Sequence, residues 1–69
     1  VPKLQSTNLT KKEQVILSLI SEGYSNTRIA DSQFVTVHTV KRHVYNIFKK
    51  INVNNRVQAV QWLNSMHHN

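Results

Sequence analysis

Hydrophobic residues recur along this chain at the three- and four-residue spacing of an α-helix, in separate stretches divided by polar turns. The clearest stretch carries Val40, Val44, Ile47 and Ile51 at positions i, i+4, i+7 and i+11, which is one face of a helix of about 15 residues. An earlier apolar stripe runs from Val15 to Ile20. The pattern predicts an all-α domain of four helices, over about Lys11–Glu22, Asn26–Ser32, Val37–Ile51 and Arg56–Met66.

A polar residue that can accept a backbone hydrogen bond stands before each predicted helix. Thr10 is followed three residues later by Glu13, which is the spacing of a capping box, and Asn55 is followed by Gln58 at the same spacing. The other two predicted N-caps are Ser25 and Thr36.

The connections between the helices are short. Gly23 follows the first helix, where a left-handed residue commonly ends a helix. Gln33, Phe34 and Val35 break the second helical pattern, and we expect a turn whose two apolar side chains are buried in the core. The second and third helices are then joined by about four residues, which predicts a helix-turn-helix over about residues 25–44 whose later helix lies in the DNA major groove.

The polar face of the predicted helix Val37–Ile51 has no acidic residue. A solvated helix face usually mixes both signs of charge, yet the chain has no Asp or Glu from Val35 to Asn69. A surface that carries hydrogen-bond donors and positive charges, with no acidic residue, is typical of one that faces phosphates. The candidate DNA-contacting residues on this face are His38, Arg42, Tyr45, Asn46 and Lys49, with Lys41 on its margin.

These side chains have the chemistry that reads DNA. Arg42 and Lys41 can reach the guanine acceptors of the major groove, and Asn46 can pair with adenine. Tyr45 either contacts a base edge or a phosphate, or is a plain surface aromatic. Thr39 either caps the helix or contacts DNA.

Composition narrows the class of protein. The chain has 69 residues and a formal charge of +6, which favours a polyanionic partner, with nucleic acid ahead of an acidic membrane. It has no Cys, which excludes disulfides, thiol catalysis and Cys-type zinc sites. The longest apolar run is Val15–Leu17, too short to span a membrane. The chain does not begin with Met, so we expect a fragment of a longer protein, with residues 1–8 as a poorly ordered linker tail and residues 67–69 as a solvated C-terminal tail.

Other functions compete with duplex DNA binding. A single-strand binder needs several exposed aromatic rings, but Phe48 and Trp62 lean toward the core and leave only Tyr45 and Tyr24. A hydrolase or nuclease needs convergent acids, and the three acidic residues lie apart. A protein-interaction module that uses Val57 and Val60, without DNA, is a further alternative. The four histidines lack the spacing of a metal site, so we expect no metal, no cofactor and no enzymatic activity.

The sequence resembles the LuxR/FixJ (NarL)-type helix-turn-helix of bacterial transcription regulators over about Leu9–Trp62. The stretches Tyr45–Ile51 (YNIFKKI) and Gln58–Trp62 (QAVQW) look most like the biofilm-matrix (curli-type) regulators of that family. The shared stretches are Leu9–Glu13 (LTKKE), Gly23–Asn26 (GYSN), Ile29–Ala30, Thr39–His43 (TVKRH), Lys50–Ile51 and Asn55–Ala59 (NRVQA).

The resemblance implies roles for individual residues. Thr39 and His43 would lie on or near phosphates, and Asn26 would lie near the DNA backbone. Lys41, Arg42 and Tyr45 would face the bases. The resemblance also implies a bacterial cytoplasmic, nucleoid-associated protein of which this domain is the C-terminal output part. RNA polymerase is a candidate partner, whereas we expect no membrane and no small-molecule ligand for this segment.

The sequence departs from the family pattern at three positions. Gln33 stands where the family usually has Leu, and we expect neighbouring Phe34 to fill that space. Arg28 stands where relatives are often acidic, which adds positive charge near the DNA. Lys12 replaces the commoner Arg.

The predicted helix Arg56–Met66 has two apolar faces. Ala59, Trp62, Leu63 and Met66 form a stripe that should pack on the core. Val57 and Val60 fall on a second face, and the family resemblance implies that this face pairs two copies on DNA. The candidate pairing residues are Val57, Val60, Gln61 and Asn64.

Overall fold

A computed structural model describes residues 9–67 of the chain. Every regular element within this range is a helix, as predicted, and the ends lie within one residue of the predicted positions. The expected tail at residues 1–8, and residues 68–69 of the expected C-terminal tail, lie outside the described residues, whereas His67 is the last residue of the final helix. The helices are α2 (Lys11–Ser21), α3 (Asn26–Gln33), α4 (Val37–Ile51) and α5 (Arg56–His67).

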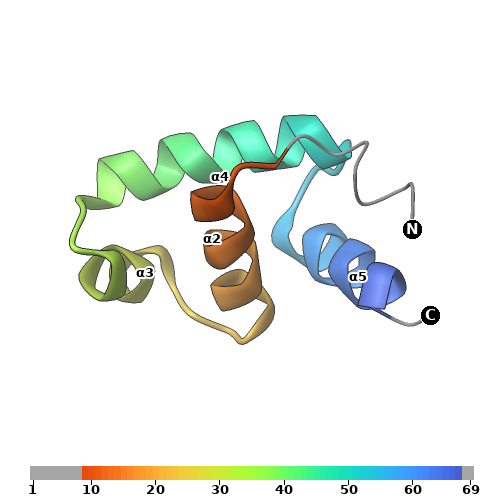
Figure 1. The fold of residues 1–69 in the computed structure, drawn as a ribbon, viewed down its shortest axis with the longest axis horizontal. Coiled ribbons are helices and arrows are strands. Elements are labelled where there is room, and N and C mark those ends of the chain that lie inside the picture. The colour runs from red at the N-terminus through yellow and green to blue at the C-terminus, as the bar shows by residue number, and fades with distance from the viewer. Residues whose placement is uncertain (1–8, 68–69) are drawn as a thin grey trace.

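The longest helix, α4, lies across the other three (Figure 1). Seen in that view, α3 is under one end of α4, α5 is under the other, and α2 lies between them. The helix α2 therefore forms the centre of the packing, and α3, α4 and α5 all contact it.

The predicted N-caps are present at the first three helices. The Thr10 hydroxyl accepts a hydrogen bond from the Glu13 backbone N–H, and a Glu13 carboxylate oxygen accepts from the Thr10 N–H, each at 3.1 Å. Ser25 and Thr36 likewise accept from the backbone N–H three residues later. These bonds satisfy donors that a helix N-terminus leaves without an intrahelical partner.

The cap of α5 differs in one bond from the predicted capping box. The Asn55 side chain accepts from the Gln58 backbone N–H at 2.9 Å, as predicted. The Gln58 side chain accepts from the Asn54 N–H at 2.7 Å, one residue earlier than the box requires. The prediction of a reciprocal box was wrong in this detail, because the turn before α5 brings the preceding amide within reach of Gln58.

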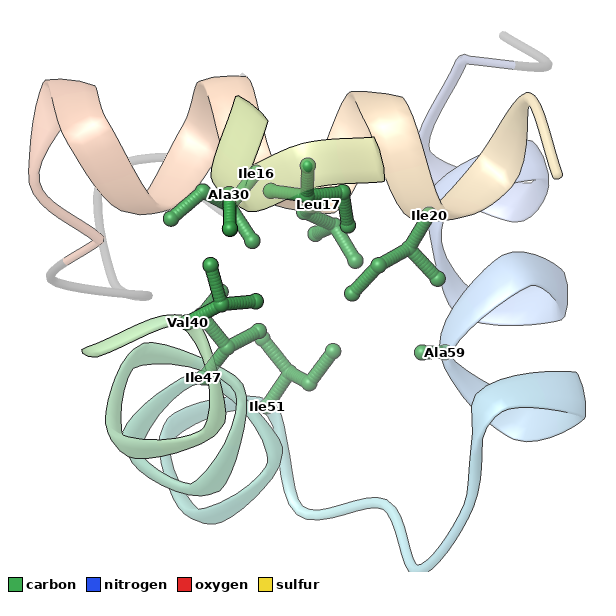
Figure 2. Close-up of a cluster of buried hydrophobic side chains, with 9 residues drawn as sticks. Ile16, Leu17, Ile20, Ala30, Val40, Ile47, Ile51 and Ala59 are labelled. Carbon is green, nitrogen blue, oxygen red and sulfur yellow. The ribbon is translucent and has the colours of Figure 1, made fainter. Parts of the chain in front are cut away.

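Figure 2 shows the core that joins the four helices. The side chains of α4 point toward those of α2, and Ala59 faces them from α5. Trp62 and Leu63 pack against this core, as predicted, while the Met66 side chain lies outside what the structure describes. The buried apolar residues are Ile16, Leu17, Ile20, Ile29, Ala30, Val40, Ile47, Ile51 and Ala59.

The turn between α3 and α4 corrects one prediction. Val35 packs against the core, but Phe34 is 94% exposed and fills no space near Gln33. Phe34 ends α3 in the left-handed conformation, with φ 59° and ψ 43°, and this geometry directs its side chain outward. Gln33 is half-buried, and its side-chain oxygen lies 3.4 Å from the Lys12 ammonium. Gly23 has a φ of +94° after α2, as predicted.

Replacing Phe34 with Asn should stabilise the domain by about 0.5–1 kcal/mol, because the left-handed region is less unfavourable for Asn than for other residues with a side chain. The exposed ring loses no packing in this change. Asn52 ends α4 in nearly the same conformation, with φ 60° and ψ 52°, and supplies the matched control. Asn52→Phe should destabilise by a similar amount. Urea unfolding measures the free energy of unfolding of both variants. A Phe34→Asn variant less stable than the wild type would contradict the claim that the left-handed backbone is unfavourable for Phe34.

Candidate nucleic-acid interface

The two sides of α4 differ completely in their surroundings. Val40, Ile47 and Ile51 are buried, and Val44 is half-buried against the same core. On the opposite side Tyr45 is 62% exposed. The exposed residues of α4 include the five that the helical pattern assigned to the polar face, His38, Arg42, Tyr45, Asn46 and Lys49, and also Lys41, which it placed on the margin.

Thr39 and His43 lie on the margin of this face, and both are half-buried. The Thr39 N–H donates to the Thr36 hydroxyl at 3.1 Å, and the two hydroxyls lie 3.0 Å apart. Thr39 therefore takes part in the cap of α4, which is one of the two roles predicted for it. Its hydroxyl is held close to the N-terminus of the helix by this pair of bonds.

Two positively charged side chains lie over aromatic rings. The Lys49 ammonium lies 5.3 Å from the centre of the Tyr45 ring on the exposed side of α4. The Arg28 guanidinium lies 4.5 Å from the centre of the Tyr24 ring, beside α3. Cation–π contacts of this kind contribute about 0.5–1 kcal/mol at exposed sites, so they reduce the freedom of the side chains while leaving their charges accessible.

Asn26 is separate from the face of α4 and is bound to α5. It is the first residue of α3 and is half-buried. Its side-chain oxygen accepts from Arg56 Nη1 at 3.0 Å, and Arg56 Nη2 donates to the Tyr24 carbonyl at 2.5 Å. Arg56 was not among the predicted site residues. A cation in the first turn of a helix opposes the helix dipole, and that unfavourable placement was the available signal of a specific partner elsewhere.

One ion pair joins α2 to α4. Lys50 Nζ lies 2.8 Å from the carboxylate of Glu13, which is the one buried charged residue in the described chain, at 4% exposure. Burial alone raises the pKa of Glu13. The hydrogen bonds from Lys50 and from the Thr10 backbone, with the charges of Lys50 and His43, outweigh it and hold the pKa below the ordinary value of 4.5. The sequence predicted Glu13 as a cap but missed this second role.

The exposed apolar surface of α5 is smaller than predicted. Val57 is 65% exposed, and Gln61 and Asn64 are exposed beside it at helical spacing. Val60 is half-buried and packs against the core, so the prediction of two exposed valines was wrong. Val60 therefore belongs partly to the side of α5 that packs on the core.

Other kinds of site find little support in residues 9–67. This part of the chain has no group of three His, Asp or Glu side chains close enough to hold a metal ion. None of its helices has the length and apolar character needed to cross a bilayer. Phe48 and Trp62 pack against the core, as predicted, and are not stacking surfaces for bases.

Two successive helices joined by a short turn, the second carrying an exposed face without acids, define a helix-turn-helix DNA-binding domain of the kind that controls transcription. Residues 7–63 match the family described as bacterial regulatory proteins, luxR family. The chain belongs to this family, whose members are transcriptional regulators rather than enzymes. The resemblance inferred from the sequence motifs is confirmed.

Individual relatives agree with this assignment. The chain is 52% identical over 60 residues to the CsgBAC operon transcriptional regulatory protein of Escherichia coli K12 and to a probable csgAB operon transcriptional regulatory protein of Salmonella typhimurium. These matches cover 87% of this chain and 28% of each relative, and they are consistent with the expected curli-type subgroup. It is also 52% identical over 52 residues to the response regulator protein VraR of Staphylococcus aureus, covering 75% of this chain and 25% of that one. The chain thus spans about a quarter of the length of these relatives.

Glu13→Gln should show how much the ion pair contributes to stability apart from the cap. Gln still completes a capping box, but it is neutral and cannot form an ion pair with Lys50. At pH 7 we expect a loss of about 1 kcal/mol, a modest value because Lys50 is one-third exposed. The pKa of folded Glu13 lies below its ordinary value, so the stabilisation is present above that value and is lost as the pH falls through the folded-state pKa.

Urea unfolding of the wild type and the Gln variant at pH 7 and pH 3 tests this linkage. The difference in free energy of unfolding should be smaller at the lower pH. A difference that stays constant with pH would show that the Glu13 charge contributes nothing to stability.

Proposed function

We propose that this chain is the C-terminal output domain of a bacterial transcriptional regulator and binds specific sequences in double-stranded DNA. The observation that carries the proposal is the exposed face of α4, where donors and cations occur without any acid. The buried opposite side of the same helix fixes that face to the rest of the domain. An α-helix has the width that the major groove of B-form DNA admits.

In this proposal the face of α4 divides into two parts. Lys41, Arg42, Tyr45 and Asn46 are exposed and contact the base edges. Thr39 and His43, half-buried on the margin, contact phosphates, as do His38, Lys49 and Asn26. Hydrogen bonds to phosphates set the position of the helix, and contacts to bases select the sequence.

We also propose that two copies pair through α5 when they bind DNA. The family resemblance implies this pairing, and Val57, with Gln61 and Asn64 beside it, is the exposed surface of α5 that would form the contact. Two recognition helices related by a two-fold axis enter the major groove about one helical turn apart, roughly 10 base pairs centre to centre. An operator selected from random duplexes should therefore be an inverted repeat with this spacing.

The rest of the regulator would supply the signal. The named relatives are about four times longer than the aligned segment, and one of them is a response regulator. We infer an upstream receiver or sensor domain, action in the bacterial cytoplasm on the nucleoid, and RNA polymerase as a partner of the bound domain.

Arg42→Ala and Lys41→Ala should each weaken binding to the selected operator by about 1–3 kcal/mol, because a side chain that contacts bases loses specific hydrogen bonds. Lys11→Ala, at an exposed position on α2, removes the same charge outside the face of α4 and should have a much smaller effect. Fluorescence anisotropy with operator and random duplexes measures the affinities. Equal losses on both duplexes would assign Arg42 and Lys41 to phosphates, and unchanged binding on both would refute the role of this face.

Val57→Glu should abolish cooperative binding to the two half-sites, because two copies would bring like charges together at the pairing contact. Val57 is exposed, so the substitution leaves the fold intact, whereas the same change at Val60 would disturb the core. Ser18→Glu, at an exposed position on α2, is the control with the same change of charge. Titration of duplexes with one and two half-sites distinguishes the effects, and a Val57→Glu variant that still binds both half-sites cooperatively would contradict pairing through α5.

A further inference from the structure

Arg56 links two parts of the domain that are distant in sequence. It is the first residue of α5, yet its guanidinium binds the Asn26 side chain and the Tyr24 carbonyl at the start of α3. Both hydrogen bonds are partly buried. The planar fork of an arginine can hold two acceptors at once in a fixed geometry, which a lysine cannot do.

The chemistry of Arg56 determines which way the Asn26 amide faces. A guanidinium has donors and no acceptor, so the oxygen of the Asn26 amide must face Arg56 and the nitrogen must face away. Within the part of the chain that the structure describes, no hydrogen bond is formed by the Asn26 nitrogen. The amide is therefore half-buried and oriented, with its donor group still available.

The position of Arg56 is not explained by local helix stability. A cation at a helix N-terminus opposes the dipole, and the only ion pair among residues 9–67 is that of Glu13 with Lys50. The guanidinium instead binds α5 to the beginning of α3, which is where the half-buried Asn26 lies. Binding to the Tyr24 carbonyl alone would join the two helices, whereas the bond to Asn26 also orients a side chain.

We propose that Arg56 is a positioning residue for DNA binding, which holds the Asn26 amide so that its nitrogen donates to a phosphodiester oxygen of the duplex. The inference rests on the proposed function, because it requires that Asn26 faces the DNA backbone. It assigns to Arg56 an effect through Asn26 rather than a phosphate contact of its own. It also makes the start of α5, next to Val57, part of the arrangement that binds DNA.

A double-mutant cycle tests the inference with the 69-residue chain and one fixed duplex of about 30 base pairs, about three helical turns. The variants are Asn26→Ala, Arg56→Lys and the two combined, each measured at several salt concentrations. Arg28→Lys makes the same replacement at the arginine that lies over Tyr24 and serves as the matched control. All measurements are made at a temperature at which thermal melts show every variant to be folded.

Asn26→Ala and Arg56→Lys should each weaken binding about three- to tenfold, and the combined variant should be no weaker than the single ones. Arg28→Lys keeps the charge that Arg28 adds near the DNA, so it should weaken binding less than either test variant and leave the salt dependence unchanged. The slope of log affinity against log salt concentration should stay the same in Arg56→Lys and Asn26→Ala, because the charge is kept and a neutral amide releases no counterion. Additive losses, or wild-type affinity in Arg56→Lys, would overturn the inference.

Asn26→Asp gives a second test that does not depend on the stability of the arginine variant. Asp keeps an acceptor for Arg56 but removes the donor, so the domain should remain as stable as the wild type while binding is lost by more than tenfold. Wild-type affinity in Asn26→Asp would refute the phosphate contact. A wild-type chain that does not bind duplex DNA in a salt-dependent way refutes the proposed function itself, and that result is visible without any variant.

Discussion

The structure depends on the packing of one side of α4 against α2. Val40, Ile47 and Ile51 meet the apolar stripe of α2 in the centre of the domain (Figure 2). Full burial of a side chain of this size contributes about 1.5–3 kcal/mol, which is a large share of the stability of so small a domain. Because this side of α4 must be buried, its opposite side is exposed, and the residues there are free of any structural requirement to be apolar.

An ion pair also fixes the position of α4 relative to α2. The Glu13 carboxylate caps its own helix and pairs with Lys50 near the end of α4. One buried group thus fixes the beginning of α2 and the end of α4 together. At the other end, Thr36 and Thr39 join through their hydroxyls and begin α4 directly after the turn. The orientation of the exposed face follows from these contacts.

Local patterns in the sequence predicted most of the fold, because caps and apolar stripes act over three or four residues. The Thr36 cap and the bounds of α4 agree with the sequence for this reason. The contacts of Lys50 with Glu13 and of Arg56 with Asn26 join residues 37 and 30 positions apart, and no local pattern encodes them. Phe34 was misplaced because hydrophobicity suggested burial, whereas the backbone of the turn directs the ring into solvent.

Membership of the luxR family establishes the kind of domain, and the arrangement of charges on α4 supports how it acts. The central claim is that the duplex lies against this face. Mapping of amide chemical shifts by nuclear magnetic resonance, during titration with a duplex of about 20 base pairs, tests it most directly. We expect the largest shifts at His38, Arg42 and Tyr45 and at the start of α3. Shifts confined to α2 and α5, with α4 unaffected, would contradict it.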